Sequence, residues 1–169
     1  MSAITDHDAY KRLAPFIKGA KSTIDFYVNG SKIELSNPNP EHTLLDFLRS
    51  QPGLKGTKLG CGEGGCGACT CVIQTSEAGA LRHLAVNACL FPLIGVIGKH
   101  VITIEGIGDV DSPHPLQERI AKLHGSQCGF CTPGFVMNTH AFLQQHPAAT
   151  QQDVEDIFGG NLCRCTGYR

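Results

Sequence analysis

The sequence predicts an α+β protein in which a small domain of strands and one helix precedes an all-helical domain. Two observations lead to this fold class. An Asn29-Gly30 pair separates two apolar-rich runs near the start of the chain, which is the strongest short-range signal for a β-hairpin. Beyond about residue 110, no strand-like pattern is found, and apolar residues recur at helical spacing instead.

The first domain is expected to cover residues 23–110, after an N-terminal extension at 1–22. Leu44, Leu45, Phe47 and Leu48 lie at helical spacing after a Pro- and Asn-rich turn, whereas the other apolar runs are short and strand-like. The elements expected in this domain are two hairpin strands, one helix and two later strands, at 23–28, 32–35, 43–49, 70–75 and 101–104.

The second domain is expected to cover residues 111–169 and to contain helices only. Proline favours the first turn of a helix, so Pro133 can start one that ends before Pro147. Thr150 followed by Asp153 is typical of an N-cap with an acidic first turn. Together with Leu116, Ile120 and Leu123 on one helical face, these signals predict helices at 116–124, 133–146 and 151–158.

Composition excludes several classes of protein. With 41% hydrophobic and 17% charged residues the chain should fold, and a net charge of −1 argues against a nucleic-acid binder. No apolar run approaches the ~20 residues that a membrane helix needs, and residues 1–21 lack the apolar core of a secretory signal. The expected compartment is therefore the cytoplasm, with the peroxisome as the alternative. There thiols stay reduced, so grouped cysteines indicate metal before disulfides.

Four of the nine cysteines form a first group. Cys61, Cys66 and Cys69 share one loop, and Cys89 follows twenty positions later. This spacing, C-x4-C-x2-C…C, is that of plant-type [2Fe–2S] ferredoxins. A four-cysteine zinc site is the alternative, but zinc usually takes paired C-x2–4-C knuckles rather than three ligands from one loop. The first group therefore predicts a [2Fe–2S] cluster.

The loop around this group is rich in glycine, with Gly60, Gly62, Gly64, Gly65 and Gly67. A backbone without Cβ atoms can wrap closely and direct N–H groups at the sulfur atoms, whose negative charge needs donors. Such hydrogen bonds also raise the reduction potential. We therefore expect a bulkier residue at Gly65 to impair cluster assembly or to shift the potential.

A second group consists of Cys128 and Cys131, followed 32 residues later by Cys163 and Cys165. By spacing alone, C-x2-C with C-x-C fits zinc and iron–sulfur equally well, and a redox-active C-x-x-C pair is a third option. The two pairs flank the expected helices, so they should meet where helix ends converge. The ninth cysteine, Cys71, lies in an expected strand and is interpreted as a small buried apolar side chain that faces the same way as Cys69.

Four motifs together resemble a known family. They are K-L-G-C-G-E-G-G-C-G-A-C-T at 58–70, N-A-C-L at 87–90, G-S-Q-C-G-F-C-T-P-G-F at 125–135 and G-N-L-C-R-C-T-G-Y-R at 160–169. In this order they resemble the iron–sulfur module of the molybdenum hydroxylases, the family of the xanthine dehydrogenases and aldehyde oxidases. The segments I-E-G-I-G at 104–108 and H-P-L-Q-E-R-I-A-K at 114–122 are closest to its xanthine dehydrogenase members.

The resemblance implies a ferredoxin-like β-grasp domain followed by a four-helix bundle, with one [2Fe–2S] cluster in each. It implies that Cys128, Cys131, Cys163 and Cys165 hold the second cluster. It places Gln127 and Cys165 beside a molybdopterin, and the Gly62–Gly65 loop on the side of an FAD. Electrons would then run from molybdenum through the second cluster and the first cluster to FAD, and finally to NAD⁺ or oxygen.

The expected partners are FAD-binding and molybdopterin-binding domains or subunits of the same enzyme, within a larger oligomer, with no nucleic acid and no membrane. The residues that carry substrate chemistry are expected on those partners, because no catalytic group is evident in this chain. Family members with a single chain continue beyond the position of Arg169. The chain is thus expected to be a piece of such a polypeptide, or alternatively a separate small subunit of a bacterial-type dehydrogenase. An independent ferredoxin and a zinc-stabilised interaction domain are the competing functions.

Overall fold

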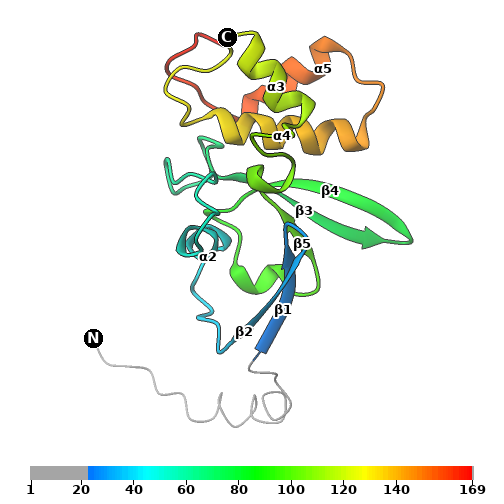
Figure 1. Ribbon diagram of the computed structural model, residues 1–169. Coiled ribbons are helices and arrows are strands. Elements are labelled where there is room, and N and C mark those ends of the chain that lie inside the picture. Colours follow the sequence, from blue (N-terminus) through cyan, green and yellow to red (C-terminus); the bar gives the residue numbers. More distant parts are fainter. Residues whose placement is uncertain (1–22, 169) are drawn as a thin grey trace.

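A computed structural model describes residues 23–168, so the predicted extension at 1–22 lies outside the described residues. The first part of the chain forms a five-stranded mixed sheet with the order β2-β1-β5-β3-β4. Only the pairing of β1 with β5 is parallel. The strands are β1 (Thr23–Val28), β2 (Ser31–Ser36), β3 (Thr70–Glu77), β4 (Ala80–Asn87) and β5 (His100–Ile102). Figure 1 shows this sheet below a layer of helices.

The predicted hairpin at the start is confirmed. Asn29 and Gly30 both adopt left-handed backbone conformations, with φ of 48° and 83°, as a two-residue turn of this kind requires. The strand β4 was not expected. Its turn with β3, at Ala78 and Gly79, also has two positive φ angles, but it carries no Asn-Gly or Asp-Gly signal. The segment predicted as a strand at 101–104 ends earlier, because Ile104 begins the 3-10 helix η2 (Ile104–Gly106).

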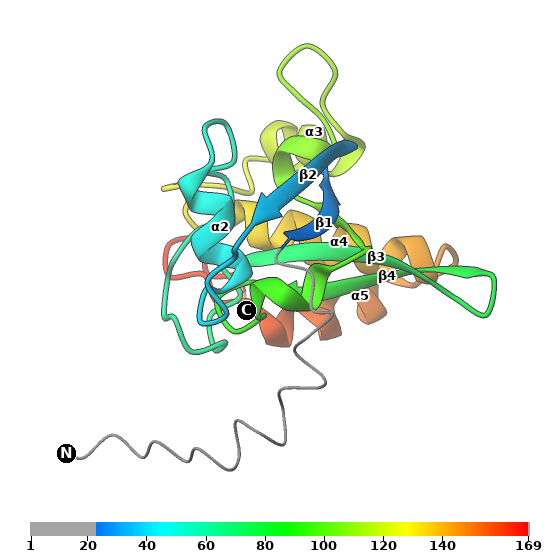
Figure 2. The same cartoon turned by 90° about the horizontal axis from the view of Figure 1, so that it is seen from below.

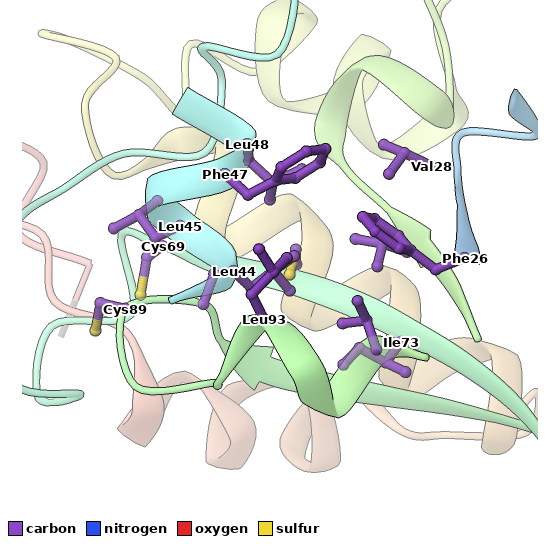
Figure 3. Close-up of a cluster of buried hydrophobic side chains, with 14 of the residues drawn as sticks. Phe26, Val28, Leu44, Leu45, Phe47, Leu48, Cys69, Ile73, Cys89 and Leu93 are labelled. Atoms are coloured by element: carbon purple, nitrogen blue, oxygen red, sulfur yellow. The ribbon is translucent and has the colours of Figure 1, made fainter. Parts of the chain in front are cut away.

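One face of the sheet is covered by the helix α2 (Leu44–Ser50), which was predicted at 43–49. Thr43 and Asp46 form a capping box at its start, and its four apolar side chains are buried. Phe47 packs edge-on against Phe26 of β1, with the ring centroids 5.3 Å apart. Figure 3 shows this core, which also contains Leu93 of the 3-10 helix η1 (Leu93–Val96).

The opposite face of the sheet carries the second domain. The helix α4 (Thr132–Gln145) runs along β3 and β4 in both views (Figure 1, Figure 2). Val72 of β3 packs there with Met137 and Ala141 of α4, and all three are buried. The strand β3 is thus buried on both faces, which explains its nearly continuous apolar start, Cys71-Val72-Ile73.

The second domain also contains α3 (Pro115–Lys122) and α5 (Gln151–Ile157), the latter followed by the 3-10 turn η3 (Phe158–Gly160). Thr150 caps α5 through a capping box with Asp153, as predicted. The described part of the chain therefore has four α-helices in all, one in the sheet domain and three after it. The resemblance implies four helices in the second domain. The described residues differ from this expectation, because this domain has three α-helices and one 3-10 turn. None of the helices between residues 23 and 168 is long and apolar enough to cross a membrane.

Candidate metal centres

The β3–β4 hairpin brings the first cysteine group together. Cys69 immediately precedes β3 and Cys89 lies two residues after β4. The antiparallel register pairs Thr70 with Asn87, so both cysteines come to the same end of the hairpin. Both are buried in the core beside α2, where Figure 3 shows them next to Leu45.

The other two cysteines of this group lie on the glycine-rich loop that precedes β3. Backbone N–H groups point at their sulfur atoms. Glu63 and Gly65 donate to Cys61 Sγ at N···S distances of 3.4 and 3.3 Å, and Cys61 N–H donates to Cys66 Sγ at 3.4 Å. The expected set of inward N–H groups is therefore present, although only one of the donors belongs to a glycine.

These donors shape the electrostatics of the group. The N–H of Glu63, then that of Cys66, lower the pKa of Cys61 to about 7. Burial has the opposite effect on Cys69, whose pKa rises to about 12. The exposed loop side of the group is thus arranged to hold a thiolate, while the buried side favours a thiolate only when a positive charge such as iron compensates it.

Individual glycines of this loop serve different purposes. A Cβ at Gly65 would meet nothing within 4 Å, so the expected steric need at this residue is not supported, and its N–H is what matters. At Gly67 the backbone is left-handed, with φ of 69°, and a Cβ would lie 2.3 Å from the carbonyl oxygen of Gly160. Gly67 therefore permits the close approach of the second domain.

The second cysteine group lies where helix ends converge, as expected. Cys128 and Cys131 precede α4, and Cys163 and Cys165 follow η3. The sulfur atoms of Cys128 and Cys165 are 3.5 Å apart. Cys163 Sγ lies 3.0 Å from the hydroxyl of Thr166, a contact that sequence reasoning missed.

The thiols of this group are also unequal. The hydroxyl of Thr166 lowers the pKa of Cys163 to about 7, and the N–H of Phe130 lowers that of Cys128. Burial raises the pKa of Cys131 to about 11. The exposed Cys165 differs from Cys128, because its contact with the Cys128 thiol raises its pKa.

No three Cys, His, Asp or Glu side chains within residues 23–168 are arranged around a point where a single metal ion would sit. The residues fit a cluster on other grounds. Soft thiol ligands suit iron–sulfur clusters, and N–H groups directed at sulfur are the second-sphere contacts that such clusters use. The eight predicted ligands are placed as two groups, and their assignment as ligands stays a prediction.

The two groups meet through the main chain. The N–H of Leu162, next to Cys163, donates to the carbonyl oxygen of Cys66 at 2.9 Å. One hydrogen bond therefore joins a residue of the first group to the neighbour of a residue of the second. The sequence separation of 96 positions left no local signal for this contact.

The remaining predicted residues differ in their exposure to solvent. Cys71 is fully buried in the same core cluster as Cys69, which confirms the packing interpretation and the shared face. Gln127 is exposed, as are its neighbour in the sequence, Cys128, and Cys165, whose sulfur atom lies 3.5 Å from that of Cys128. In the first group only Cys61 is exposed.

Comparison with known proteins gives both domains a family. Residues 26–93 match the family described as "2Fe-2S iron-sulfur cluster binding domain", and residues 103–169 match "[2Fe-2S] binding domain". A chain of quinoline 2-oxidoreductase from Pseudomonas putida 86 has 36% sequence identity and a TM-score of 0.74, over 86% of this chain and 85% of that one. The chain belongs to the iron–sulfur modules of the molybdenum hydroxylase family.

Within this family, the chain is also similar to parts of much longer proteins. It is 56% identical to xanthine dehydrogenase of Blastobotrys adeninivorans over 149 residues, which is 86% of this chain and 11% of that protein. For xanthine dehydrogenase/oxidase of Mus musculus the identity is 53%, over 88% of this chain and 12% of that protein. Aldehyde oxidoreductase from Desulfovibrio gigas matches with a TM-score of 0.77 and 38% identity, over 86% of this chain and 15% of that chain.

The chain thus spans about a tenth of the length of the curated relatives that it matches. The comparisons resolve the choice that spacing left open, because the second group lies in a [2Fe–2S]-binding domain and not in a zinc domain. The protein is an iron–sulfur module with two [2Fe–2S]-binding domains, and its role is electron transfer.

Proposed function

We propose that this iron–sulfur module carries electrons from a molybdenum centre to FAD within a xanthine dehydrogenase-like hydroxylase. Relatives with 53–56% identity include proteins named xanthine dehydrogenase and xanthine dehydrogenase/oxidase, which supports this branch of the family. The molybdopterin- and FAD-binding parts would be its partners, and the cytoplasm is its proposed compartment.

One observation carries the proposal. The hydrogen bond of 2.9 Å from Leu162 N–H to the Cys66 carbonyl connects the two cysteine groups by a short main-chain route. An independent ferredoxin needs only one redox centre and no such connection. Two cysteine groups joined by one main-chain hydrogen bond suit a module that passes electrons from one centre to the next.

The ligands follow from the two groups. We propose that Cys61, Cys66, Cys69 and Cys89 hold the first cluster, and that Cys128, Cys131, Cys163 and Cys165 hold the second. When bound, each cluster supplies a site that accepts and releases one electron. The chain itself binds the iron through thiolates, and it directs the N–H groups of Glu63 and Gly65 at Cys61.

The exposed cysteines indicate which cluster faces which partner along the electron-transfer route. Gln127 and Cys165, both exposed, are proposed to face the molybdopterin, as the family resemblance implies. Cys61 is the exposed cysteine of the first group and is proposed to face the flavin. The proposed β-grasp and helical-bundle domains would then each present one exposed edge to a different partner.

A second candidate has its own support. The matched chain of quinoline 2-oxidoreductase is covered to 85% by this chain, so a module of this size also occurs as a separate chain. The alternative function is therefore that of a separate small iron–sulfur subunit in an aldehyde or other molybdenum dehydrogenase.

Metal analysis tests the proposal directly. The purified, anaerobically handled chain is expected to hold four iron and four acid-labile sulfide ions per molecule. Reduction with dithionite should then produce two distinguishable electron spin resonance signals. A single cluster, or zinc in place of iron in the Cys128 group, would contradict the proposed function.

A further inference from the structure

We propose that Asn161 is a positioning residue that holds the two cluster sites in electronic contact. This inference rests on the proposed electron-transfer function and names the residue that fixes its central contact. Asn161 lies directly before Leu162, whose N–H reaches the Cys66 carbonyl, and its own side chain reaches the next residue of the opposite loop.

The Asn161 side chain is 1% exposed and both of its polar atoms are paired. Its Nδ2 donates to the carbonyl oxygen of Gly67 at 3.0 Å, and its Oδ1 accepts from Asn138 Nδ2 of α4 at 2.8 Å. Its backbone carbonyl accepts from the hydroxyl of Tyr168 at 2.8 Å. A buried amide that donates to one domain and accepts from the other fixes their relative position more sharply than apolar packing does.

Two hydrogen bonds therefore connect consecutive residues of one domain to consecutive residues of the other. Asn161 bonds to Gly67 through its side chain, and Leu162 bonds to Cys66 through its backbone. Glycines make room for both. A Cβ at Gly134 would lie 2.2 Å from the Gly67 carbonyl oxygen, and one at Gly67 would lie 2.4 Å from Asn161 Nδ2.

The bond to Gly67 is not needed to satisfy that carbonyl. Gly67 also accepts from the N–H and the hydroxyl of Thr70, at 3.1 and 2.7 Å. Asn138 likewise keeps a second bond, from Nδ2 to the carbonyl of Ile157. Removing the Asn161 side chain thus leaves the Gly67 carbonyl paired and takes from Asn138 one of its two Nδ2 bonds, so the loss within the first domain should be small and the contact between the domains should weaken.

This contact matters for transfer because tunnelling decays steeply with distance and is far weaker across a gap than through bonds. Transfer between the sites makes and breaks no bond: one electron leaves a reduced cluster and enters an oxidised one. The chain can influence that step only through the distance, the route and the local field. A carbonyl held 2.9 Å from a backbone nitrogen by Asn161 is such a route.

The test compares three variants of the cluster-loaded chain. Asn161→Ala removes both side-chain bonds, whereas Asn161→Asp keeps the size and the bond from Asn138 but sets a carboxylate oxygen against the Gly67 carbonyl. Asn87→Ala is the matched control, because Asn87 Nδ2 also donates to a glycine carbonyl of the same loop, that of Gly64, at 2.8 Å, within the first domain. Iron content, the potential of each cluster, hydrogen exchange of residues 159–163 and the magnetic interaction between the two reduced clusters are measured.

Both Asn161 variants are expected to keep four irons and unchanged potentials. The Leu162 amide should exchange at least about fivefold faster, since one hydrogen bond shifts an equilibrium by about that factor. The magnetic splitting should weaken and equilibration of a single added electron between the clusters should slow. Asn87→Ala should match the unaltered chain in amide exchange at Leu162, in magnetic splitting and in the rate of electron equilibration.

Unchanged coupling in Asn161→Asp, together with faster exchange at Leu162, would overturn the proposal. So would unchanged exchange at Leu162, or loss of the second cluster from both Asn161 variants, since the residue would then be structural only. If only Asn161→Ala loses iron, the proposal is judged from the cluster coupling and the Leu162 exchange of Asn161→Asp. A wild-type chain that lacks two clusters or any interaction between them would instead contradict the proposed function.

Discussion

At the residue scale, two glycines two positions apart in the cluster loop have opposite requirements. Gly65 has open space around the position of a Cβ and contributes its N–H to Cys61. Gly67 has a left-handed backbone and lies against Gly160 and Asn161 of the second domain. The cysteine spacing could identify this loop as a ligand loop, but it could not tell these two glycines apart, because the second domain that constrains Gly67 approaches from 94 positions away.

Alanine substitutions should separate the two glycines. Gly67→Ala is expected to destabilise the loaded chain by at least about 2 kcal/mol, because a left-handed alanine costs ~1–2 kcal/mol and the Gly160 carbonyl must also move. That corresponds to a fall of roughly 4–8 °C in the apparent unfolding midpoint. Gly65→Ala should stay within about 0.5 kcal/mol of the unaltered chain.

The measurement is thermal unfolding followed by cluster absorbance, with iron content determined first. Gly65→Pro serves as a further comparison, since it removes the N–H that Cys61 accepts and should lower iron retention. Equal midpoints for the two alanine variants would show that the close approach at Gly67 is not limiting.

At the scale of elements, the sequence predicted the helices and the hairpin whose formation depends on neighbouring residues. The first hairpin followed from Asn29-Gly30, and α2 and α5 followed from apolar spacing and from capping residues. The strand β4 could not be predicted in the same way. Its sequence places Arg82 and His83 between apolar residues without a regular alternation. It is a strand because it pairs along its whole length with β3 and is covered by α4.

The histidine of β5 gives this sheet a dependence on pH. His100 Nε2 accepts from the N–H of Gly30 in the first turn, at 2.9 Å, so that nitrogen carries no proton in the neutral ring. The other ring nitrogen, Nδ1, lies 3.0 Å from Gln74 Oε1 and carries the proton. Burial lowers the pKa of His100 below its ordinary 6.5, which agrees with a neutral ring that fastens the hairpin to β5.

Acidification should therefore weaken the fold through His100. The unfolded chain takes up a proton near pH 6.5 and the folded chain only at lower pH, so this stabilisation is complete above 6.5 and is lost as the pH falls below it. His100→Gln keeps an acceptor for Gly30 but does not titrate. Its unfolding midpoint is expected to match that of the unaltered chain at pH 7.5 and to fall less on moving to pH 5.5.

His140, whose pKa is lowered by burial first and by His114 and His83 next, titrates in both proteins and so cancels from the comparison. Identical losses of stability for His100→Gln and the unaltered chain between the two pH values would exclude this role for His100.

At the scale of the whole molecule, the packing of the two domains brings the two cysteine groups close together. The helix α4 packs on the sheet face opposite α2 (Figure 1), and its first turn lies against the loop of the first group, where a Cβ at Gly134 would be 2.2 Å from the Gly67 carbonyl oxygen. This packing joins two small domains into one module, in which a hydrogen bond connects Cys66 to the neighbour of Cys163. The sequence predicted two [2Fe–2S]-binding domains, and its assignment of eight cysteines as ligands stays a prediction. The contact between the domains could not be predicted, because it depends on tertiary packing of residues far apart in the chain.

In the proposed hydroxylase, with its molybdenum and FAD parts present, removing one cluster at a time should show the direction of transfer. Cys66→Ser is expected to leave molybdenum and the second cluster reducible by substrate while FAD stays oxidised. Cys163→Ser should stop reduction of everything beyond molybdenum. The reason is that a missing intermediate site leaves a gap too long for tunnelling, even though no group that makes or breaks bonds is lost.

Rapid mixing with substrate, followed by electron spin resonance and flavin absorbance, measures this order. Each substitution should also destabilise its own domain, because cluster binding and folding are coupled in units of this size. The comparison therefore uses only preparations whose remaining cofactors are shown to be intact. If Cys66→Ser blocked reduction of the second cluster but left flavin reduction unchanged, the first cluster would lie on the molybdenum side, and the direction proposed from the exposed cysteines would be reversed.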